Sequence, residues 1–268
     1  MKFSFLTLFP TLISGYFSDS ILKRAIDLQK IEVEIIDFRK FSTNKHKKVD
    51  NYQASGGAGL VICADVLERT LGQIATPQSH IIYLTPVAKR FLQCDAKRLS
   101  QNQRHIIFIC GRYEGVDERV IEGFVDEVFC IGDYILTGGE LASMVLCDCI
   151  ARQIPSVLGN EKSLCGESFE KNLLEAPLFT QNIATKNSAQ NGARDGARDG
   201  AMQNGARDIA TQNGTRDGAM QNGATRLNIP SQYLNGNHRK IGEFKTALSK
   251  AKTKYFRPDL FLAQSTLG

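Results

Sequence analysis

Two glycine-rich stretches, Cys130–Glu140 (CIGDYILTGGE) and Gly111–Gly115 (GRYEG), determine how this sequence is interpreted. Each follows a run of apolar residues, many of them β-branched or aromatic, which is typical of a buried strand. In open α/β sheets, ligands bind at the carboxyl ends of strands, where the backbone must come close and side chains must be small. The two stretches therefore predict a glycine-lined pocket, with the alternative that glycines such as Gly138 and Gly139 only form turns.

Length and composition are those of a protein with a substantial hydrophobic core. The chain has 268 residues, 42% of them hydrophobic, which is enough for one large domain or two smaller ones. No segment reaches the roughly 18 consecutive apolar residues that a membrane-spanning helix needs, and the first residues do not have the pattern of a signal peptide. We therefore expect a cytoplasmic protein with no membrane partner. The formal net charge of +5 permits nucleic-acid binding without demonstrating it.

The cysteines indicate reduced thiols rather than disulfides or a metal centre. Their number is odd, and no two of them have CxxC spacing. A zinc site would need clustered pairs or accompanying histidines, and Cys147 and Cys149 have neither. We therefore predict no metal ligands.

The order of apolar segments predicts a parallel sheet covered by helices. Strand-like runs alternate with segments whose apolar residues recur at helical spacing. Strands are expected at residues 2–8, 31–38, 80–84, 105–110 and 125–131, and helices at 19–30, 64–74, 88–100, 116–123 and 140–153. This β-α-β order indicates one α/β domain over about the first 160 residues.

A basic run lies between the second and third predicted strands. Residues 39–49 contain Arg39, Lys40, Lys45, His46, Lys47 and Lys48, and the glycine-rich segment Ser55–Gly59 follows. Such a run is usually a solvated loop, but next to a glycine-rich turn it could instead hold phosphate. The glycine pattern is neither GxGxxG nor a P-loop, which disfavours a dinucleotide-binding or nucleotide-hydrolysing protein.

Residues 187–225 differ sharply in composition from the rest of the chain. They consist of near-repeats of Asn-Gly-Ala-Arg-Asp type with almost no apolar side chains, so folding entropy cannot be recovered there. We predict a disordered insertion, with an RNA-binding Arg-Gly segment as the alternative.

The C-terminal segment predicts an amphipathic helix with a basic face. Its apolar residues recur at intervals of three and four, at Ile241, Phe244, Leu248, Ala251 and Tyr255. Asn237 is the expected N-cap, and Pro258 marks the expected end. The polar side carries Arg239, Lys240, Lys245, Lys250, Lys252, Lys254 and Arg257 against the single acid Glu243. This face is either an ordinary solvated surface or a contact for a phosphate backbone.

These motifs together resemble those of TrmD-type bacterial tRNA (guanine-N(1))-methyltransferases, of the SPOUT class. The matching motifs are FSFLTLFP at 3–10, SGGAG at 55–59, IIYLTP at 81–86, CGRYEGVDERV at 110–120, IGDYILTGGEL at 131–141, ARQIPSVLGN at 151–160, ESF at 167–169 and GNH at 236–238. They cover nearly the whole chain outside the insertion. GRYEG and IGDYxLTGGE, in that order and spacing, are the most specific of them.

The resemblance implies a fold, a cofactor and partners. The fold would be α/β, a parallel sheet with a deep trefoil knot over residues 1–162, followed by a loop at 163–186, the insertion at 187–225 and a small α-helical C-terminal domain at 226–268. The methyl donor would be S-adenosylmethionine, and the enzyme a homodimer with active sites between subunits. The implied cofactor-binding residues are Tyr83, Leu84, Thr85, Pro86, Gly111, Ile131, Gly132, Asp133, Tyr134, Ile135, Leu136, Gly138 and Gly139.

The resemblance also assigns the chemistry. Methylation of guanine N1 requires a proton to leave, so a carboxylate general base is expected, and Glu167 occupies the position where the family has aspartate. Arg152 would stabilise negative charge that develops on the guanine oxygen. Glu114, Asn237, His238 and Lys245 are the expected substrate contacts, the substrate being tRNA with its guanosine 3′ of the anticodon.

The departure at Glu167 and the long insertion leave an alternative function open. The chain could be a non-catalytic RNA-binding protein that retains the SPOUT fold. The sequence does not indicate which tRNAs are preferred, whether Mg²⁺ assists deprotonation, or what the insertion does.

Overall fold

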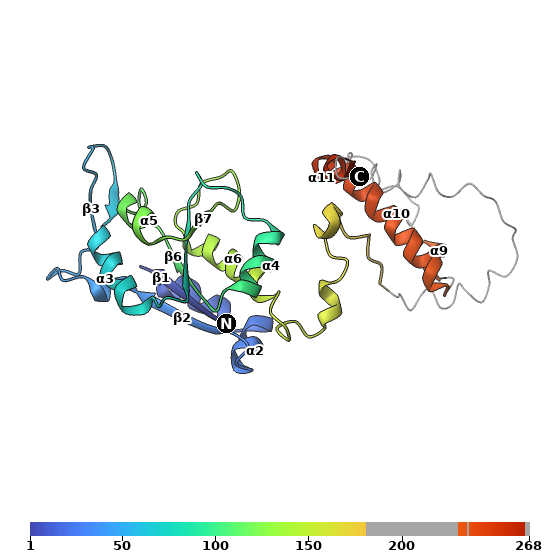
Figure 1. Cartoon of the computed structure of the whole chain (residues 1–268), viewed down its shortest axis with the longest axis horizontal. Helices are drawn as coiled ribbons and strands as arrows, with labels where there is room; N and C mark the ends of the chain where they lie inside the picture. The colour runs from blue at the N-terminus through green and yellow to red at the C-terminus, as the bar shows by residue number, and fades with distance from the viewer. Residues whose placement is uncertain (181–229, 235, 266–268) are drawn as a thin grey trace, which may run out of the picture. The chain divides into compact units, whose positions relative to one another are not determined.

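The structure is a computed structural model that describes residues 1–180, 230–234 and 236–265 (Figure 1). The predicted insertion at 187–225 lies outside these residues. The chain divides into two compact units, Met1–Leu164 and Cys165–Gly268, and each is described by itself.

A five-stranded parallel sheet forms the centre of the first unit, with strand order β2-β1-β6-β5-β7. The strands are β1 (Lys2–Thr7), β2 (Glu32–Asp37), β5 (Ser79–Leu84), β6 (His105–Ile109) and β7 (Glu127–Phe129). Each strand runs parallel to its neighbours, as the alternation of strand-like and helix-like segments predicted.

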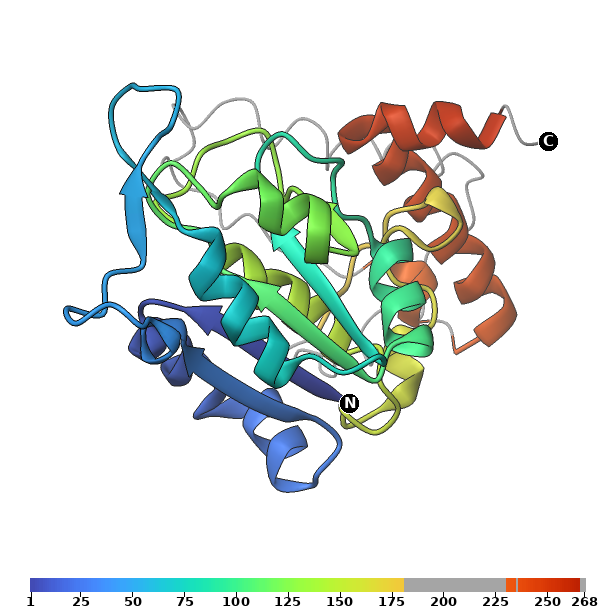
Figure 2. The ribbon, with the colours of Figure 1, turned by 60° about the vertical axis from the view of Figure 1, so that its left-hand side comes forward.

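Helices cover both faces of this sheet (Figure 2). The first face packs on α1 (Pro10–Ser14), η1 (Gly15–Phe17), α2 (Ser20–Asp27), α4 (Gln93–Asn102) and α6 (Glu140–Ala151), and the second on η2 (Phe38–Phe41), α3 (Ala64–Ile74) and α5 (Glu118–Phe124). Successive strand residues alternate between the two cores: Phe108 belongs to the first, whereas Ile107 and Ile109 belong to the second. Both faces are therefore apolar, which explains the continuous apolar runs in the sequence.

The structure differs from the sequence predictions in two local features. The expected helix at residues 88–100 begins only at Gln93, because the preceding residues pair with the segment after β7: the Phe91 amide donates to the Cys130 carbonyl at 2.9 Å. A short antiparallel hairpin, β3 (Asp50–Tyr52) and β4 (Leu60–Ile62), was not predicted at all. Its strands are only three residues long, too short for an alternating pattern to be seen.

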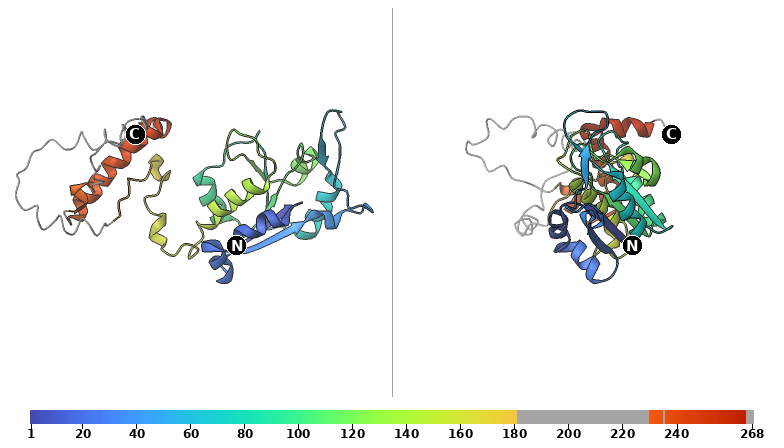
Figure 3. Two further views of the ribbon diagram at one scale, coloured as in Figure 1. Left: turned by 180° about the vertical axis from the view of Figure 1, so that it is seen from behind. Right: turned by 90° about the vertical axis from the view of Figure 1, so that its left-hand side faces the viewer.

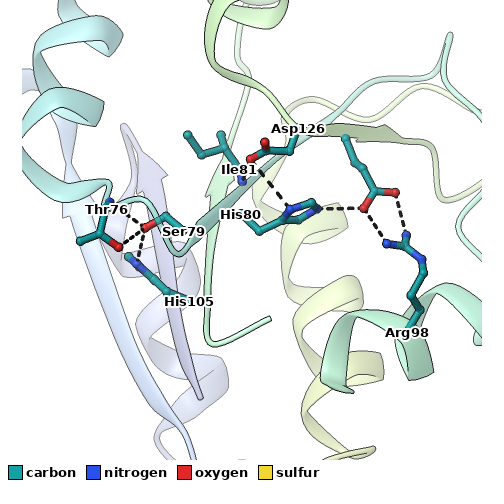
Figure 4. Close-up of polar contacts among 8 residues, drawn as sticks. Thr76, Ser79, His80, Ile81, Arg98, His105 and Asp126 are labelled. Atoms are coloured by element: carbon teal, nitrogen blue, oxygen red, sulfur yellow. Dashed lines mark hydrogen bonds and ion pairs between the residues drawn. The ribbon is translucent and has the colours of Figure 1, made fainter. Parts of the chain in front are cut away.

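At the amino ends of the strands, hydrogen bonds between side chains connect neighbouring strands (Figure 4). His105 lies 2.8 Å from Ser79 Oγ through Nδ1 and 2.9 Å from Ser4 Oγ through Nε2, so it joins three neighbouring strands. Beside it, the Glu127 carboxylate lies 2.8 Å from His80 Nε2 and accepts hydrogen bonds from Arg98 at 2.9 and 2.7 Å.

The described part of the second unit is mostly helical. After η3 (Glu161–Leu164) at the end of the first unit come η4 (Glu170–Asn172), α9 (Ser231–Leu234), α10 (His238–Phe256) and α11 (Pro258–Ser265). α10 is the long helix of this unit (Figure 3). Asn237 caps it as predicted, its side chain accepting from the Lys240 amide at 3.2 Å. It ends at Phe256, before Pro258, but a further helix, α11, follows unpredicted.

The buried face of α10 differs in part from the predicted apolar stripe. Leu248 is buried, but Tyr255 is 53% exposed. Two hydroxyl residues are buried in addition, because they bind the extended segment that follows η4. Thr253 Oγ1 accepts from the Leu174 amide at 2.8 Å, and Ser249 Oγ donates to the Leu174 carbonyl.

Candidate functional site

A cavity of about 370 Å³ opens at the carboxyl ends of β5, β6 and β7. It is lined by three segments that leave these strands, together with Ala142 on α6: Tyr83–Val87, Gly111–Gly115 and residues 129–139 apart from Asp133. Its size lies within the range of roughly 300–1,000 Å³ that small-molecule sites occupy. The glycine-rich stretches therefore form the walls of a pocket, as the sequence predicted.

All of the thirteen residues predicted to bind a cofactor line this cavity except Asp133. Asp133 is exposed, and its carboxylate forms an ion pair with Arg90 on the segment that precedes α4. Glu114, predicted to contact the substrate, also lines the cavity. The lining further includes Val87, Arg112, Tyr113, Gly115, Phe129, Cys130, Thr137 and Ala142, which were absent from the predicted set. Most of them lie within the same sequence motifs as the predicted residues, so their position in those motifs could have indicated them.

The two glycine stretches touch each other through their backbones. The Gly139 amide donates to the Gly111 carbonyl at 2.8 Å, and a Cβ on Gly139 would lie 2.8 Å from the Gly111 nitrogen and 3.0 Å from the Cys110 Cα. A Cβ on Gly111 would lie 3.1 Å from the Tyr83 hydroxyl. Side chains at these positions would push the walls apart, so the glycines do more than form turns.

A buried ion pair ties these walls to the sheet. Glu140, the first residue of α6, is 2% exposed, and it accepts hydrogen bonds from Thr7 Oγ1 at 2.8 Å and Arg112 Nε at 3.1 Å. Its other oxygen, Oε2, lies 2.9 Å from Arg112 Nε and accepts no hydrogen bond from any described residue. Arg112 Nη1 donates to the Thr137 carbonyl at 3.1 Å, so this one side chain spans both glycine stretches. A Cβ on Gly138 would overlap Arg112 Nε.

Tyr83 contributes a buried hydroxyl to the second face of the sheet, beneath the cavity. Burial raises the pKa of Tyr83 above its ordinary value. The hydroxyl therefore stays protonated and neutral at physiological pH. Because Gly111 and Gly115 both lie close to it, the tyrosine sets how near the GRYEG segment approaches β5.

The β3–β4 hairpin packs against the outer side of the GRYEG segment. The Glu114 amide donates to the Leu60 carbonyl at 3.0 Å, and the Ile62 amide to the Gly115 carbonyl at 3.0 Å. Gly59 has φ +89°, and a Cβ there would overlap the Glu114 side chain. The SGGAG motif thus holds Glu114 in place at the edge of the cavity.

The two predicted catalytic residues belong to different units. Arg152 is the half-buried C-cap of α6 in the first unit, and its amide donates to the Asp148 carbonyl at 3.0 Å. Glu167 is half-buried in the second unit, in the segment that the Leu174 contacts hold against α10. The predicted substrate contacts Asn237, His238 and Lys245 are exposed at the start and on the outer surface of α10.

The segment around Glu167 has a well-defined local structure. Phe169, two residues further on, adopts φ +74°, and its amide donates to the Leu173 carbonyl at 2.7 Å. The Glu175 amide donates to Ser168 Oγ at 3.1 Å, and the Arg257 guanidinium lies 5.9 Å from the centre of the Phe169 ring. The ESF motif therefore forms a tight turn whose contacts reach the C-terminal end of α10.

Within the described residues, no group of three His, Cys, Asp or Glu side chains is arranged to hold a metal ion. Nor does that part of the chain contain a helix long and apolar enough to cross a membrane. The fold and the cavity define a ligand-binding α/β protein whose site lies at the carboxyl ends of parallel strands.

Comparison with known proteins identifies the family within this class. The family model described as tRNA (Guanine-1)-methyltransferase TrmD matches residues 1–191. A tRNA (guanine-N(1)-)-methyltransferase from Wolinella succinogenes is 49% identical over 97% of this chain and 94% of its own length. Proteins of the same name from a Sulfurovum species and from Helicobacter hepaticus are each 48% identical, over 97% and 98% of this chain and 98% and 93% of their own lengths. This chain belongs to the tRNA (guanine-N(1))-methyltransferase family.

Proposed function

We propose that this protein transfers a methyl group from S-adenosylmethionine to N1 of the guanosine immediately 3′ of the anticodon in tRNA. One observation carries the proposal: the two glycine-rich stretches that wall the cavity lie in a chain 49% identical, over 97% of its length, to a tRNA (guanine-N(1)-)-methyltransferase. The family supplies the reaction and the cavity supplies the place for it.

The residues that line the cavity fit S-adenosylmethionine. Backbone groups of the three lining segments can recognise an adenine edge and a ribose, and Leu84, Ile131 and Ile135 offer apolar surface for the ring. Gly111 and Gly139, at which a Cβ would meet Tyr83 or the Cys110–Gly111 backbone, allow the walls of the cavity to lie close together. The sulfonium of this cofactor supplies an electrophilic methyl group.

The proposed chemistry uses two side chains of this protein. Glu167 would accept the proton from guanine N1 as the N1–methyl bond forms and the methyl–sulfur bond of the donor breaks, leaving a neutral thioether. A general base of this kind contributes about 10²- to 10⁴-fold in rate. Its stem is about 1.5 Å longer than that of the aspartate of the family, the length of one carbon–carbon bond. Arg152 donates to the guanine oxygen, on which negative charge develops as the proton leaves.

We further propose that the active enzyme is a homodimer. Apolar side chains on α1, η1 and α6 are exposed in the single chain: Leu12 is 53%, Tyr16 46%, Leu141 55% and Val145 39% exposed. Exposed apolar patches on a soluble protein mark interaction sites. Sedimentation or light scattering of the purified protein tests this: a monomer at micromolar concentration would contradict it.

The finer features of the fold are also proposals. We propose the trefoil knot over residues 1–162, supported by the pairing of residues 89–91 with Cys130 and by the contact of Gly139 with Gly111. We propose that α9, α10 and α11 form a small tRNA-binding domain, supported by the basic residues of α10. The seven cysteines form no disulfide, which fits the reducing cytoplasm, where we propose that the enzyme acts.

Methylation of unmodified tRNA by the purified protein, followed by nucleoside analysis, tests the proposal. We expect 1-methylguanosine in a tRNA with guanosine 3′ of the anticodon, and none when that base is adenosine. Binding of tRNA without any methylation would instead indicate a non-catalytic RNA-binding protein. Repeating the assay with and without a chelator shows whether Mg²⁺ takes part.

Replacing the proposed base separates chemistry from binding. Glu167→Gln removes the proton acceptor and keeps the size of the side chain, so we expect a single-turnover rate lower by about 10²- to 10⁴-fold. Calorimetric titration with S-adenosylmethionine should give an unchanged affinity. Near-normal rates would exclude Glu167 as the base and direct attention to Glu114.

A further inference from the structure

A basic turn in the first unit takes no part in the site described above. This basic turn, Asn44–Lys48, connects η2 to the β3–β4 hairpin, and all five of its residues are exposed. It contains three lysines and one histidine.

The basic turn is held rigidly from beneath. Ser42 is 4% exposed, its Oγ donates to the Lys48 carbonyl at 2.6 Å, and it accepts from the Asn44 amide at 3.3 Å. Asn44 in turn accepts the His46 amide on its side chain at 2.8 Å and the Lys47 amide on its carbonyl at 2.9 Å. Lys47 adopts φ +54°, a conformation uncommon outside glycine, which these bonds maintain. The lysines therefore project from a fixed backbone.

The positive charge of the basic turn is not compensated by acids. No described carboxylate forms an ion pair with any of its three lysines; Lys47 Nζ donates to the Ser42 carbonyl at 3.3 Å, and Lys48 Nζ to Asn51 Oδ1 at 3.5 Å. Five arginines elsewhere in the unit are paired: Arg39 with Asp37, Arg69 with Asp65, Arg98 with Glu127, Arg112 with Glu140 and Arg119 with Asp117. Three unpaired cations within four residues attract an anion of extended charge.

The basic turn is connected to the edge of the cavity. The Val49 carbonyl accepts from the Cys63 amide at 2.8 Å, next to the β4 residues that bind the GRYEG segment. Burial, followed by a hydrogen bond to Asp50, raises the pKa of Tyr113, so the start of β3 is in contact with a residue that lines the cavity. Tyr52, at the other end of the same strand, is 79% exposed, and an exposed aromatic ring is a surface on which a base can stack.

We propose that the basic turn binds the phosphate backbone of the RNA strand next to the nucleotide that is methylated. Lysine suits this role because it acts as a point charge that recognises phosphate without reading sequence. Neighbouring lysines of a turn can each bind one of several consecutive phosphates of an extended strand. The proposal rests on the proposed function, in that the RNA is the tRNA substrate.

The test compares two variants with the same change of charge. In the first, Lys45, Lys47 and Lys48 are replaced by glutamine. In the control, Lys30, Lys97 and Arg104 are replaced by glutamine; these residues lie on α4 or just before β2 and β6, and none forms an ion pair with a described carboxylate. The dissociation constant for unmodified tRNA is measured across a range of KCl concentrations, with methylation at saturating tRNA and S-adenosylmethionine binding alongside.

We expect only the first variant to lose affinity for tRNA. The slope of log Kd against log salt concentration should become shallower by about 0.7–0.9 for each lost phosphate contact, which is about 2–3 for the three lysines. The kcat and the cofactor affinity should stay at wild-type values. A slope and an affinity equal to those of the control variant would overturn the inference even if the wild-type protein methylates tRNA. If the wild-type protein methylates no tRNA, the proposed function fails, whatever the slopes are.

Discussion

The two ends of the central sheet are built in opposite ways. At the amino ends of the strands, side chains bind side chains across strands, as in the His80–Glu127–Arg98 group and the contacts of His105. At the carboxyl ends, the backbones of Gly111 and Gly139 are in contact, and the buried Arg112–Glu140 ion pair holds the walls together. Removing a contact at the amino ends of the strands should lower only the stability of the fold. A change at the carboxyl ends should lower the affinity for the ligand.

Adding one carbon to the cavity wall should have the largest effect on the affinity for S-adenosylmethionine. Gly139→Ala would bring a Cβ to 2.8 Å from backbone, which can move only by separating the two walls. Overpacking of this kind costs about 1–3 kcal/mol, so we expect S-adenosylmethionine to bind about 10- to 100-fold more weakly by calorimetry. Gly72→Ala is the matched control, since nothing lies within 4 Å of the added Cβ. It should bind the cofactor normally and be slightly more stable, because alanine is favoured over glycine in a helix. Equal affinities of the two variants for S-adenosylmethionine would contradict the role given to the carboxyl ends of the strands.

The same substitution at the two ends should next separate affinity from stability. Glu140→Gln leaves Arg112 without its buried carboxylate, and breaking a buried pair costs about 3–5 kcal/mol, so both unfolding free energy and cofactor affinity should fall. Glu127→Gln changes a carboxylate at the amino end whose side chain is 18% exposed, and should lower stability only. Chemical denaturation and calorimetry give the two quantities. A loss of cofactor affinity in Glu127→Gln would contradict the assignment of separate roles.

A smaller effect is expected from pH at the amino end. Burial, then nearby Lys2, lowers the pKa of His105 below its ordinary value. The unfolded chain then binds the proton more readily, so this contribution to stability is present above about pH 6.5 and is lost as the pH falls towards the folded-state pKa. Between about pH 7.5 and 5.5, the melting temperature of the wild type should fall more than that of His105→Gln, by on the order of 2 °C. Parallel pH profiles would show that His105 does not contribute.

The smallest effect is expected at Asp133, which lies near the cavity without lining it. Its ion pair with Arg90 is solvent-exposed on both sides, and such pairs contribute about 0–1 kcal/mol. Asp133→Asn should therefore leave the affinity for S-adenosylmethionine within a few-fold of the wild-type value. A loss as large as that of Gly139→Ala would restore Asp133 to the cofactor-binding residues predicted from the sequence.

The sequence was most informative where local pattern decides the structure. Apolar runs marked the strands, the glycines after β6 and β7 marked the cavity, and Asn237 marked the start of α10. Contacts between distant residues left no such trace. Glu140 can be buried because Thr7, 133 positions earlier in the sequence, donates a hydrogen bond to it, and no local pattern reveals that contact. Ser249 and Thr253 are buried through hydrogen bonds to Leu174, more than seventy residues away.

The surroundings of Glu167 likewise could not be predicted from the sequence. The ESF motif indicated Glu167 by resemblance, but the turn around Phe169 and its contact with Arg257 depend on two segments separated by the insertion. No periodicity links these segments, so the sequence predicted the residue and not its surroundings. The role of Glu167 as the base stays a prediction.

Hydrogen exchange with and without S-adenosylmethionine tests most directly whether the two ends of the sheet have separate roles. On addition of the cofactor, we predict slower exchange in the segments 83–87, 111–115 and 129–139, which border the cavity. We predict unchanged exchange around Ser79, His105 and Glu127. Protection at the amino ends of the strands, or its absence from the three lining segments, would contradict the account.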